Sequence, residues 1–522
     1  MSDDYHHTIT GSDITIDQLS KLGLPNGRVS LDSEAATRIT NYRVGLEKIL
    51  NSDKAVYGIN TGFGSLANVK IDRDKISELQ KNLIASHTAG TGEYLPPEII
   101  KSAMVLRVNT FARGNSGIRL RVVELLIDMI NHNIIPRVPM YGSVGASGDL
   151  ALLSAIALCM VSPVDGVQQE VEYFTDNGWA TKGHIDALKS INIEPIELQA
   201  KEGLALNNGC QVSTSIASFA LSNAMKAFNA IMHAFALSSQ ALLANSSPFD
   251  ERVHMARPHS GQTIVANSIR ALLSDSKLID SDADKVQDAY SIRCFPQVAG
   301  SVYDGLRYAK NVFETEMNSS TDNPLLFESG DDYEPISGGN FHGAPVAHAS
   351  DFATLLCADL ASIAERLIFR LITGDMSKLP SFLTFDPGLS SGFMITQYTA
   401  ANLVSMCKSL SYPASVDSIP TCENQEDHVS MSSVAAWKLL RVSNALLSVA
   451  AIELLVACQA VQMRLQSLGS DNSILSQSSQ QTLSTVREFV PFIKSDCPMS
   501  GHIRTAEDLI KSNRLDSCID FK

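Results

Sequence analysis

The stretch "SVAAWKLLRVSNALLSVAAIELLVACQAVQ", Ser433–Gln462, decides the fold class, because it contains neither glycine nor proline. Ordinary globular helices are about 11–12 residues long, so an uninterrupted run of this length predicts an unusually long helix. Its small and aliphatic residues leave almost no polar face. A helix of this kind must be buried on nearly all sides, at the centre of a bundle or between subunits.

Two other runs without glycine or proline precede this one, from Cys210 to Pro248 and from Pro345 to Gly374. Three long helices side by side predict an all-α fold with a long central helix bundle, and the low aromatic share of 6% agrees with close-packed helices. The earlier part of the chain alternates short segments with Gly and Pro. We therefore expect a mixed, loop-rich N-terminal domain over residues 1–205 and the long-helix bundle over residues 206–522.

Composition and charge exclude several classes of protein. Among 522 residues, 41 Lys and Arg stand against 56 Asp and Glu, and no basic stripe is present, which argues against a nucleic-acid partner. The nine cysteines form no CxxC pair, so neither a disulfide framework nor a metal site is expected. The polar N-terminus is unlike a signal peptide, and polar residues interrupt the apolar runs. We expect a cytoplasmic protein without a membrane span.

The glycine-rich stretch "YGSVGASGDLALLSAIAL", Tyr141–Leu158, fits none of three common catalytic loops. No Lys follows Gly148 as a Walker loop requires, the glycine spacing is not that of a dinucleotide loop, and Asp149 stands where a hydrolase elbow needs glycine. One remaining interpretation is a turn before a helix that starts near Asp149, with this carboxylate near the positive end of the helix.

The other interpretation is covalent. In Ala146-Ser147-Gly148, the Gly148 amide nitrogen can attack the Ala146 carbonyl carbon, and loss of two waters turns Ser147 into an alkene. The product is a methylidene-imidazolone (MIO), a strong electrophile made from backbone. Glycine supplies an unhindered nitrogen and permits the tight bend, alanine leaves the carbonyl accessible, and serine supplies the hydroxyl that is eliminated.

"GSVGASGDLALLS" is the most specific of several segments in which the chain resembles the aromatic amino-acid ammonia-lyases, from about residue 8 to 510. The resemblance implies a helical architecture like that of fumarase and aspartase, and a homotetramer whose active sites are each built from three subunits. It implies MIO formed autocatalytically from Ala146, Ser147 and Gly148, with no diffusible cofactor.

Two further segments carry catalytic residues by this resemblance. "YGINTGFG" supplies Tyr57, which takes part in proton transfer or holds the surroundings of the electrophile. "VQDAYSIRCFPQVAGS" supplies Tyr290 as the base that removes the β-proton, Arg293 as the bidentate partner of the substrate carboxylate, and Gln287 as a contact to substrate or electrophile. A phenol has a pKa of about 10, so Tyr290 needs its phenolate stabilised, for example by Arg293.

The remaining segments indicate the substrate. "ASHTAG" carries Ser86-His87, the arrangement of the family's histidine-specific members, and "NQEDHVS" carries Glu426, a carboxylate suited to an imidazole and of no use beside a phenyl ring. Asn208 matches an amide that contacts substrate or electrophile, and Phe341 an aromatic near the substrate. Two departures are Cys210, where the family usually has threonine, and Phe295, where histidine-specific members commonly have glutamine, with a possible effect on the pocket wall.

These residues together predict the non-oxidative deamination of L-histidine to trans-urocanate and ammonia. One alternative keeps the electrophile and changes the substrate to tyrosine or phenylalanine, as a lyase or aminomutase. A second alternative is a lyase of the fumarase and aspartase type, but its GSSxMPxKxNP loop is missing from the sequence. A third, a helical assembly without enzymatic activity, disagrees with the intact tripeptide beside Tyr57, Tyr290 and Arg293.

Overall fold

The structure is a computed structural model that describes residues 4–51, 56, 58, 61, 64 and 71–521, without the side chain of Arg73. The chain divides into two compact units. The first comprises Met1–Phe219, Lys310–Ser350 and Pro413–Trp437, and the second Ala220–Ala309, Asp351–Tyr412 and Lys438–Lys522. The division expected at residues 205 and 206 stays a prediction.

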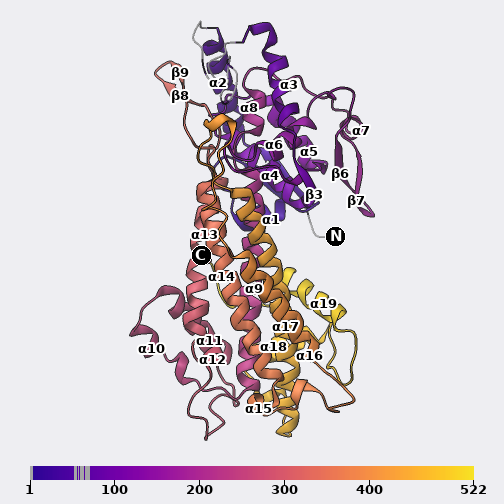
Figure 1. Cartoon of the computed structure of the whole chain (residues 1–522), viewed down its shortest axis with the longest axis vertical. Coiled ribbons are helices and arrows are strands. Elements are labelled where there is room, and N and C mark those ends of the chain that lie inside the picture. Colours follow the sequence, from indigo (N-terminus) through magenta and orange to yellow (C-terminus); the bar gives the residue numbers. More distant parts are fainter. Residues whose placement is uncertain are drawn as a thin grey trace. The chain divides into compact units, whose positions relative to one another are not determined.

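The all-α class with very long helices is confirmed (Figure 1). The three predicted long helices are α9 (Gln211–Ala241), α14 (Ala344–Ile372) and α17 (Ser432–Ser467), with 31, 29 and 36 residues. Within the second unit they run side by side with α13 (Phe295–Met317). Asn223 of α9 donates a 3.0 Å hydrogen bond to Asn444 of α17, and the rings of Tyr308 of α13 and Phe352 of α14 meet edge to face.

Helix α17 contains the most apolar long segment of the described chain. By length and composition it could cross a membrane, with a mean hydropathy of 1.8 over its best window. However, 89% of that window is buried inside the protein, as in the core helix of a globular fold. The expectation that this helix lies at the centre of a bundle agrees with that burial.

Helix α13 was not predicted from the runs without glycine or proline, because it contains Pro296, Gly300 and Gly305. Gly300 is present for packing: a Cβ there would lie 2.4 Å from the Cα of Gln262 in α11 (Ser260–Leu273). Gly261 is equally close, since its Cβ would lie 2.0 Å from the Gly300 carbonyl oxygen. These two glycines let the backbones of α11 and α13 come into contact. A prediction that treats every glycine as a helix breaker therefore misses α13.

The first unit combines short helices with four small sheets, as the loop-rich pattern predicts. Its strands pair as β1 (Tyr5–Ile9) with β2 (Gly27–Leu31), β3 (Thr91–Tyr94) with β5 (Pro139–Tyr141), β4 (Ile134–Pro136) with β6 (Glu170–Thr175) and β7 (Gly178–Gly183), and β8 (Leu325–Ser329) with β9 (Asp332–Ile336). Its short helices are α1 (Ile16–Leu22), α2 (Ser33–Leu50), α3 (Ile76–His87), α4 (Pro97–Ala112), α5 (Leu120–Asn131), α6 (Leu150–Leu158), α7 (His184–Lys189) and α8 (Glu202–Asn207). The short helices of the second unit are α10 (Glu251–Met255), α11, α12 (Tyr290–Arg293), α15 (Gly374–Ser377), α16 (Met394–Leu410), α18 (Gln477–Arg487) and α19 (Met499–Lys511).

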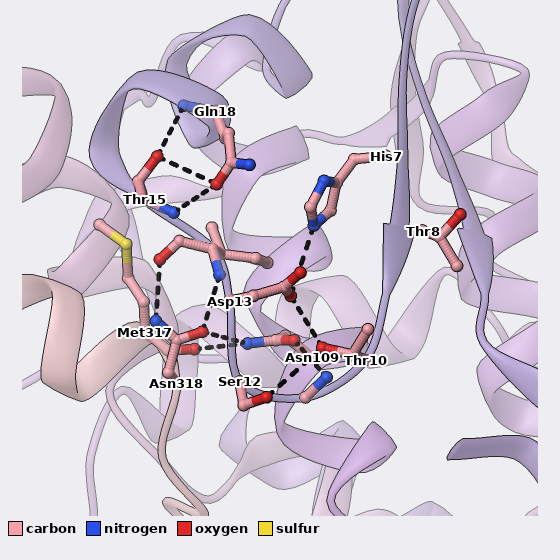
Figure 2. Close-up of polar contacts among 12 residues, drawn as sticks. His7, Thr8, Thr10, Ser12, Asp13, Thr15, Gln18, Asn109, Met317 and Asn318 are labelled. Atoms are coloured by element: carbon pink, nitrogen blue, oxygen red, sulfur yellow. Dashed lines mark hydrogen bonds and ion pairs between the residues drawn. The ribbon is translucent and has the colours of Figure 1, made fainter. Parts of the chain in front are cut away.

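A polar network fastens the N-terminal segment to the rest of the first unit (Figure 2). The fully buried amide of Asn109 in α4 accepts from the Gly11 N–H at 3.0 Å and donates to the Met317 carbonyl at 2.9 Å. Asn318 accepts from the Ile14 N–H, and Thr15 begins α1 with a capping box. The start of the chain, α4 and the end of α13 are therefore held together by paired polar groups around the buried Asn109.

Candidate active site

The Ala146-Ser147-Gly148 tripeptide lies in a tight turn between β5 and α6. Gly145 and Gly148 have positive φ angles of 66° and 77°. A Cβ at Gly148 would lie 2.1 Å from the Gly209 carbonyl oxygen, so no other residue fits there. Ala146 is buried in a small apolar cluster that includes Val429 and Met431. The turn is held rigidly, with its backbone in a conformation that requires these glycines.

Asp149 begins α6 as its N-cap residue, as expected, but its side chain does not cap that helix. Its carboxylate instead accepts from the Ser213 N–H at 2.7 Å and from the Ser213 hydroxyl at 2.5 Å. Burial raises the pKa of Asp149, and the Ser213 hydrogen bonds oppose that rise. The carboxylate therefore ties the turn to α9, while the helix starts directly after Asp149, as the turn interpretation predicts.

The polar atoms of Ser147 have partners from two other segments. Its carbonyl oxygen accepts from Asn208 Nδ2 at 3.2 Å and from the Gly209 N–H at 3.4 Å. Its hydroxyl donates to Glu426 Oε1 at 2.9 Å. The Asn208 and Gly209 N–H groups polarise the Ser147 carbonyl. Loss of the Ser147 hydroxyl does not remove either donor.

Glu426 contacts the tripeptide through Ser147, and its charge acts on His87. The second oxygen of Glu426 accepts from the Thr421 hydroxyl at 2.7 Å. His87 is the last residue of α3, and its Nδ1 lies 3.1 Å from Ser86 Oγ. Burial lowers the pKa of His87, against smaller opposing contributions from the Leu83 backbone and the Glu426 charge.

The second unit contributes its own polar cluster. Arg293 Nη1 donates to Gln287 Oε1 at 2.6 Å, and the guanidinium lies over the Tyr290 ring, 4.8 Å from its centroid. These three side chains line a hollow of about 530 Å³ together with Val286 and Cys294. The Tyr290 side chain is 69% exposed, so its phenol is accessible to a ligand.

Nine of the predicted site residues thus form two groups, one in each unit, whereas Phe341 is placed only by the hydrogen bond from Cys210 to its carbonyl. The structure brings Ala146, Ser147, Gly148, His87, Asn208 and Glu426 together in the first, and Gln287, Tyr290 and Arg293 together in the second. Tyr57 lies outside the described residues. In the described part of the chain, no three His, Cys, Asp or Glu side chains are arranged to hold a metal ion.

The profile of the aromatic amino acid lyases matches residues 14–488. The chain belongs to this family. A histidine ammonia-lyase from Caldanaerobacter subterraneus subsp. tengcongensis is 42% identical over 515 residues, which cover 98% of this chain and 97% of that protein. The crystal structure of histidine ammonia-lyase from Trypanosoma cruzi matches with a TM-score of 0.88 and 38% identity, covering 98% and 94% of the two chains. Tyrosine aminomutase from Streptomyces globisporus matches with a TM-score of 0.90 and 32% identity, covering 99% of both.

The two departures of this lyase from the family pattern have different structural consequences. The buried Cys210 thiol donates to the Phe341 carbonyl at 3.0 Å, so the replacement of threonine keeps a donor at this position and anchors the Phe341 segment. Phe295 is fully buried and stacks on Phe235, with ring centroids 4.0 Å apart. Phe295 therefore belongs to the core of the second unit, and its effect on the pocket wall stays a prediction.

Thr421 is the site residue that sequence reasoning did not identify in this lyase. It stands five residues before Glu426 in a segment without helical or strand periodicity. Three left-handed residues between them turn the chain back on itself. Because non-glycine residues seldom adopt that conformation, no pattern in the sequence indicates the reversal.

Proposed function

We propose that this chain converts L-histidine to trans-urocanate and ammonia. The observation that carries the proposal is the Glu426 carboxylate, 2.9 Å from the Ser147 hydroxyl and close to His87. A carboxylate and an imidazole beside the tripeptide offer hydrogen-bond acceptors to the ring N–H of histidine, which a phenyl ring cannot use. The similarity to proteins named histidine ammonia-lyase supports the same substrate.

We infer that Ala146, Ser147 and Gly148 cyclise to MIO. The residues fit this group, because the turn accepts only glycine at position 148 and the Ser147 carbonyl already has two N–H donors. When formed, MIO supplies an electrophile that bonds the substrate amine and lets ammonia leave. Asn208 and Gly209 hold the carbonyl oxygen at that position and stabilise negative charge on it.

The other side chains have roles in binding and proton transfer. Arg293 binds the substrate carboxylate, for which a guanidinium offers a bidentate fork, and Gln287 holds that guanidinium. Tyr290 removes the β-proton, and the Arg293 guanidinium lies over its ring. Phe341 lies against the substrate, His87 and Glu426 orient the ring, and Tyr57 assists proton transfer. No diffusible cofactor or metal enters this scheme.

The proposal extends to assembly and location. We infer a homotetramer with active sites shared among three subunits, in the cytoplasm, without nucleic-acid or membrane partners. The resemblance to the aromatic amino-acid lyases supports this assembly. Light scattering and sedimentation of the purified protein measure the oligomeric state directly.

Two measurements test the reaction. Intact mass should be lower than the sequence mass by two waters, and Ser147→Ala should restore the full mass for its own sequence. In a substrate panel, purified protein should make urocanate from histidine with much higher kcat/KM than cinnamate from phenylalanine or coumarate from tyrosine. If the intact mass of the wild type equals the sequence mass, the cyclisation is contradicted. If tyrosine is turned over faster than histidine, the chain is instead a tyrosine lyase or aminomutase.

A further inference from the structure

The Glu426 carboxylate is held at both oxygens. Ser147 Oγ donates to Oε1 at 2.9 Å and Thr421 Oγ1 donates to Oε2 at 2.7 Å. A glutamate has three flexible torsions, and its terminal torsion has broad minima, so two fixed donors restrict the carboxylate strongly. Threonine is a suitable anchor, because branching at Cβ limits its own rotation.

The backbone makes the same pairing. The Thr421 N–H donates to the Glu426 carbonyl at 3.0 Å, and the Glu426 N–H to the Thr421 carbonyl at 3.4 Å. Between them, Cys422, Glu423 and Asn424 have φ angles of 51°, 54° and 66°. Left-handed backbone is costly for residues other than glycine and persists where surrounding contacts impose it, often at functional sites. The loop is thus built to return Glu426 to the side of Thr421.

Only one of the two hydroxyl donors to Glu426 is retained when the tripeptide cyclises. Under the proposed function, on which this inference rests, cyclisation removes the Ser147 hydroxyl, and Oε1 loses its partner. Thr421 is untouched by that chemistry and continues to hold Oε2. Oε1 then faces the position that the hydroxyl had occupied and is free to accept another hydrogen bond.

We propose that Thr421 is a positioning residue that orients the Glu426 carboxylate to accept the ring N–H of the substrate. Thr421 itself makes no contact with the reacting atoms. It contributes to specificity, because a free carboxylate can rotate to bind water, whereas an anchored one offers a fixed acceptor to an imidazole.

The first experiment compares Thr421→Val, which keeps the branched shape, with Thr421→Ser, which keeps the hydroxyl. The probe is urocanate, whose dissociation constant is measured by calorimetry on protein with the wild-type loss of two waters. Loss of a hydrogen bond to a carboxylate weakens binding roughly 10- to 100-fold, so we expect that change for Val and less than about 3-fold for Ser. Thr37→Val, on an exposed helical hydroxyl that donates to the Ser33 carbonyl, is the matched control and should leave affinity unchanged.

A double-mutant cycle separates positioning from a general structural role. If Thr421 acts through Glu426, Thr421→Val should have little further effect on urocanate affinity in a Glu426→Gln background. The inference is overturned if Thr421→Val weakens urocanate binding as much in the Glu426→Gln background as in the wild type. It is also overturned if the Thr421→Val and Thr421→Ser variants bind urocanate equally well. If Thr421→Val does not fold, Thr421→Cys replaces it, because a thiol retains a weak donor. Thr421→Cys should bind urocanate with an affinity between those of the Ser variant and a variant without a donor. Wild-type affinity of Thr421→Cys overturns the inference.

The wild-type protein separates failure of this inference from failure of the proposed function. Absence of urocanate binding and of histidine turnover in the wild type overturns the proposed function, and this inference with it. Tight wild-type binding that Thr421→Val leaves unchanged overturns the inference alone. The split between KM and kcat gives a second readout, since a ring-orienting contact should raise KM for histidine with a smaller change in the KM for phenylalanine.

Discussion

The Ser147 hydroxyl donates a 2.9 Å hydrogen bond to Glu426, a residue 279 positions further along the chain. One partner belongs to the tripeptide of the proposed electrophile and the other to the proposed ring-binding group. Their contact links substrate recognition to the bond that breaks, because a ring held by Glu426 lies within reach of the tripeptide.

Glu426→Gln should reduce kcat/KM for histidine by roughly 100-fold, because an amide of the same shape carries no charge and offers one acceptor instead of two. Steady-state urocanate formation measures the effect, and intact mass checks that two waters are still lost. Glu423→Gln, at an exposed carboxylate in the same loop, is the control and should retain wild-type kinetics. Equal activity of Glu426→Gln and wild type would falsify its role in binding imidazole.

Ser86→Ala should raise KM for histidine by roughly 3- to 10-fold with little change in kcat, which is the loss expected for one neutral hydrogen bond. The Ser86 hydroxyl donates to the Leu83 carbonyl at 3.2 Å, and in the tautomer with the ring proton on Nδ1 it accepts from His87 at 3.1 Å. This arrangement leaves Nε2 as an acceptor for a ring N–H. Ser20→Ala, which removes a similar bond to the Ile16 carbonyl, is the control. A change confined to kcat contradicts the interpretation.

Glu316→Gln should stabilise the protein selectively above neutral pH. Burial raises the pKa of Glu316 from 4.5 to about 7, and Oε1 has no partner in the described structure. The stabilising contribution of the protonated form is complete below pH 4.5 and is lost as the pH rises through 7, at a cost of roughly 3 kcal/mol. The apparent Tm of the variant should therefore exceed that of the wild type at pH 8 and match it near pH 5. Glu328→Gln, at an exposed position, should shift neither value. Parallel pH profiles for Glu316→Gln and wild type contradict the assignment.

The parts of the fold that follow from local sequence were predictable. Long runs without glycine or proline predicted α9, α14 and α17, since an uninterrupted run leaves nothing to end a helix. Helix α13 was not predictable in this way, because the use of Gly300 is set by the backbone of α11 packed against it. The need for glycine at this position comes from a tertiary contact. In the sequence, a glycine that permits close helix packing looks the same as a glycine that ends a helix.

The site shows the same division between local and distant causes. The tripeptide Ala146-Ser147-Gly148 is contiguous, so its capacity to cyclise could be predicted from the sequence, and the other family-like segments favoured this over a simple turn. Its hydrogen-bond partner Glu426 was indicated only by resemblance, and Thr421 was not indicated at all, because the left-handed turn that pairs them is unfavourable for the residues it contains. Long-range pairing of this kind requires the three-dimensional structure.

Asn208→Asp should lower kcat for histidine by roughly 100- to 1,000-fold, the loss measured when one donor to a developing negative charge is removed. Asn208 Nδ2 lies 3.2 Å from the Ser147 carbonyl oxygen, and a carboxylate of the same shape replaces that N–H with a repelling oxygen. The Gly209 N–H remains as a second donor at 3.4 Å, so activity should fall without vanishing. Single-turnover kinetics measures the chemical step, and Asn177→Asp, in the exposed turn between β6 and β7, controls for added charge. If Asn208→Asp raises KM and leaves kcat intact, the amide binds the substrate and does not polarise the carbonyl.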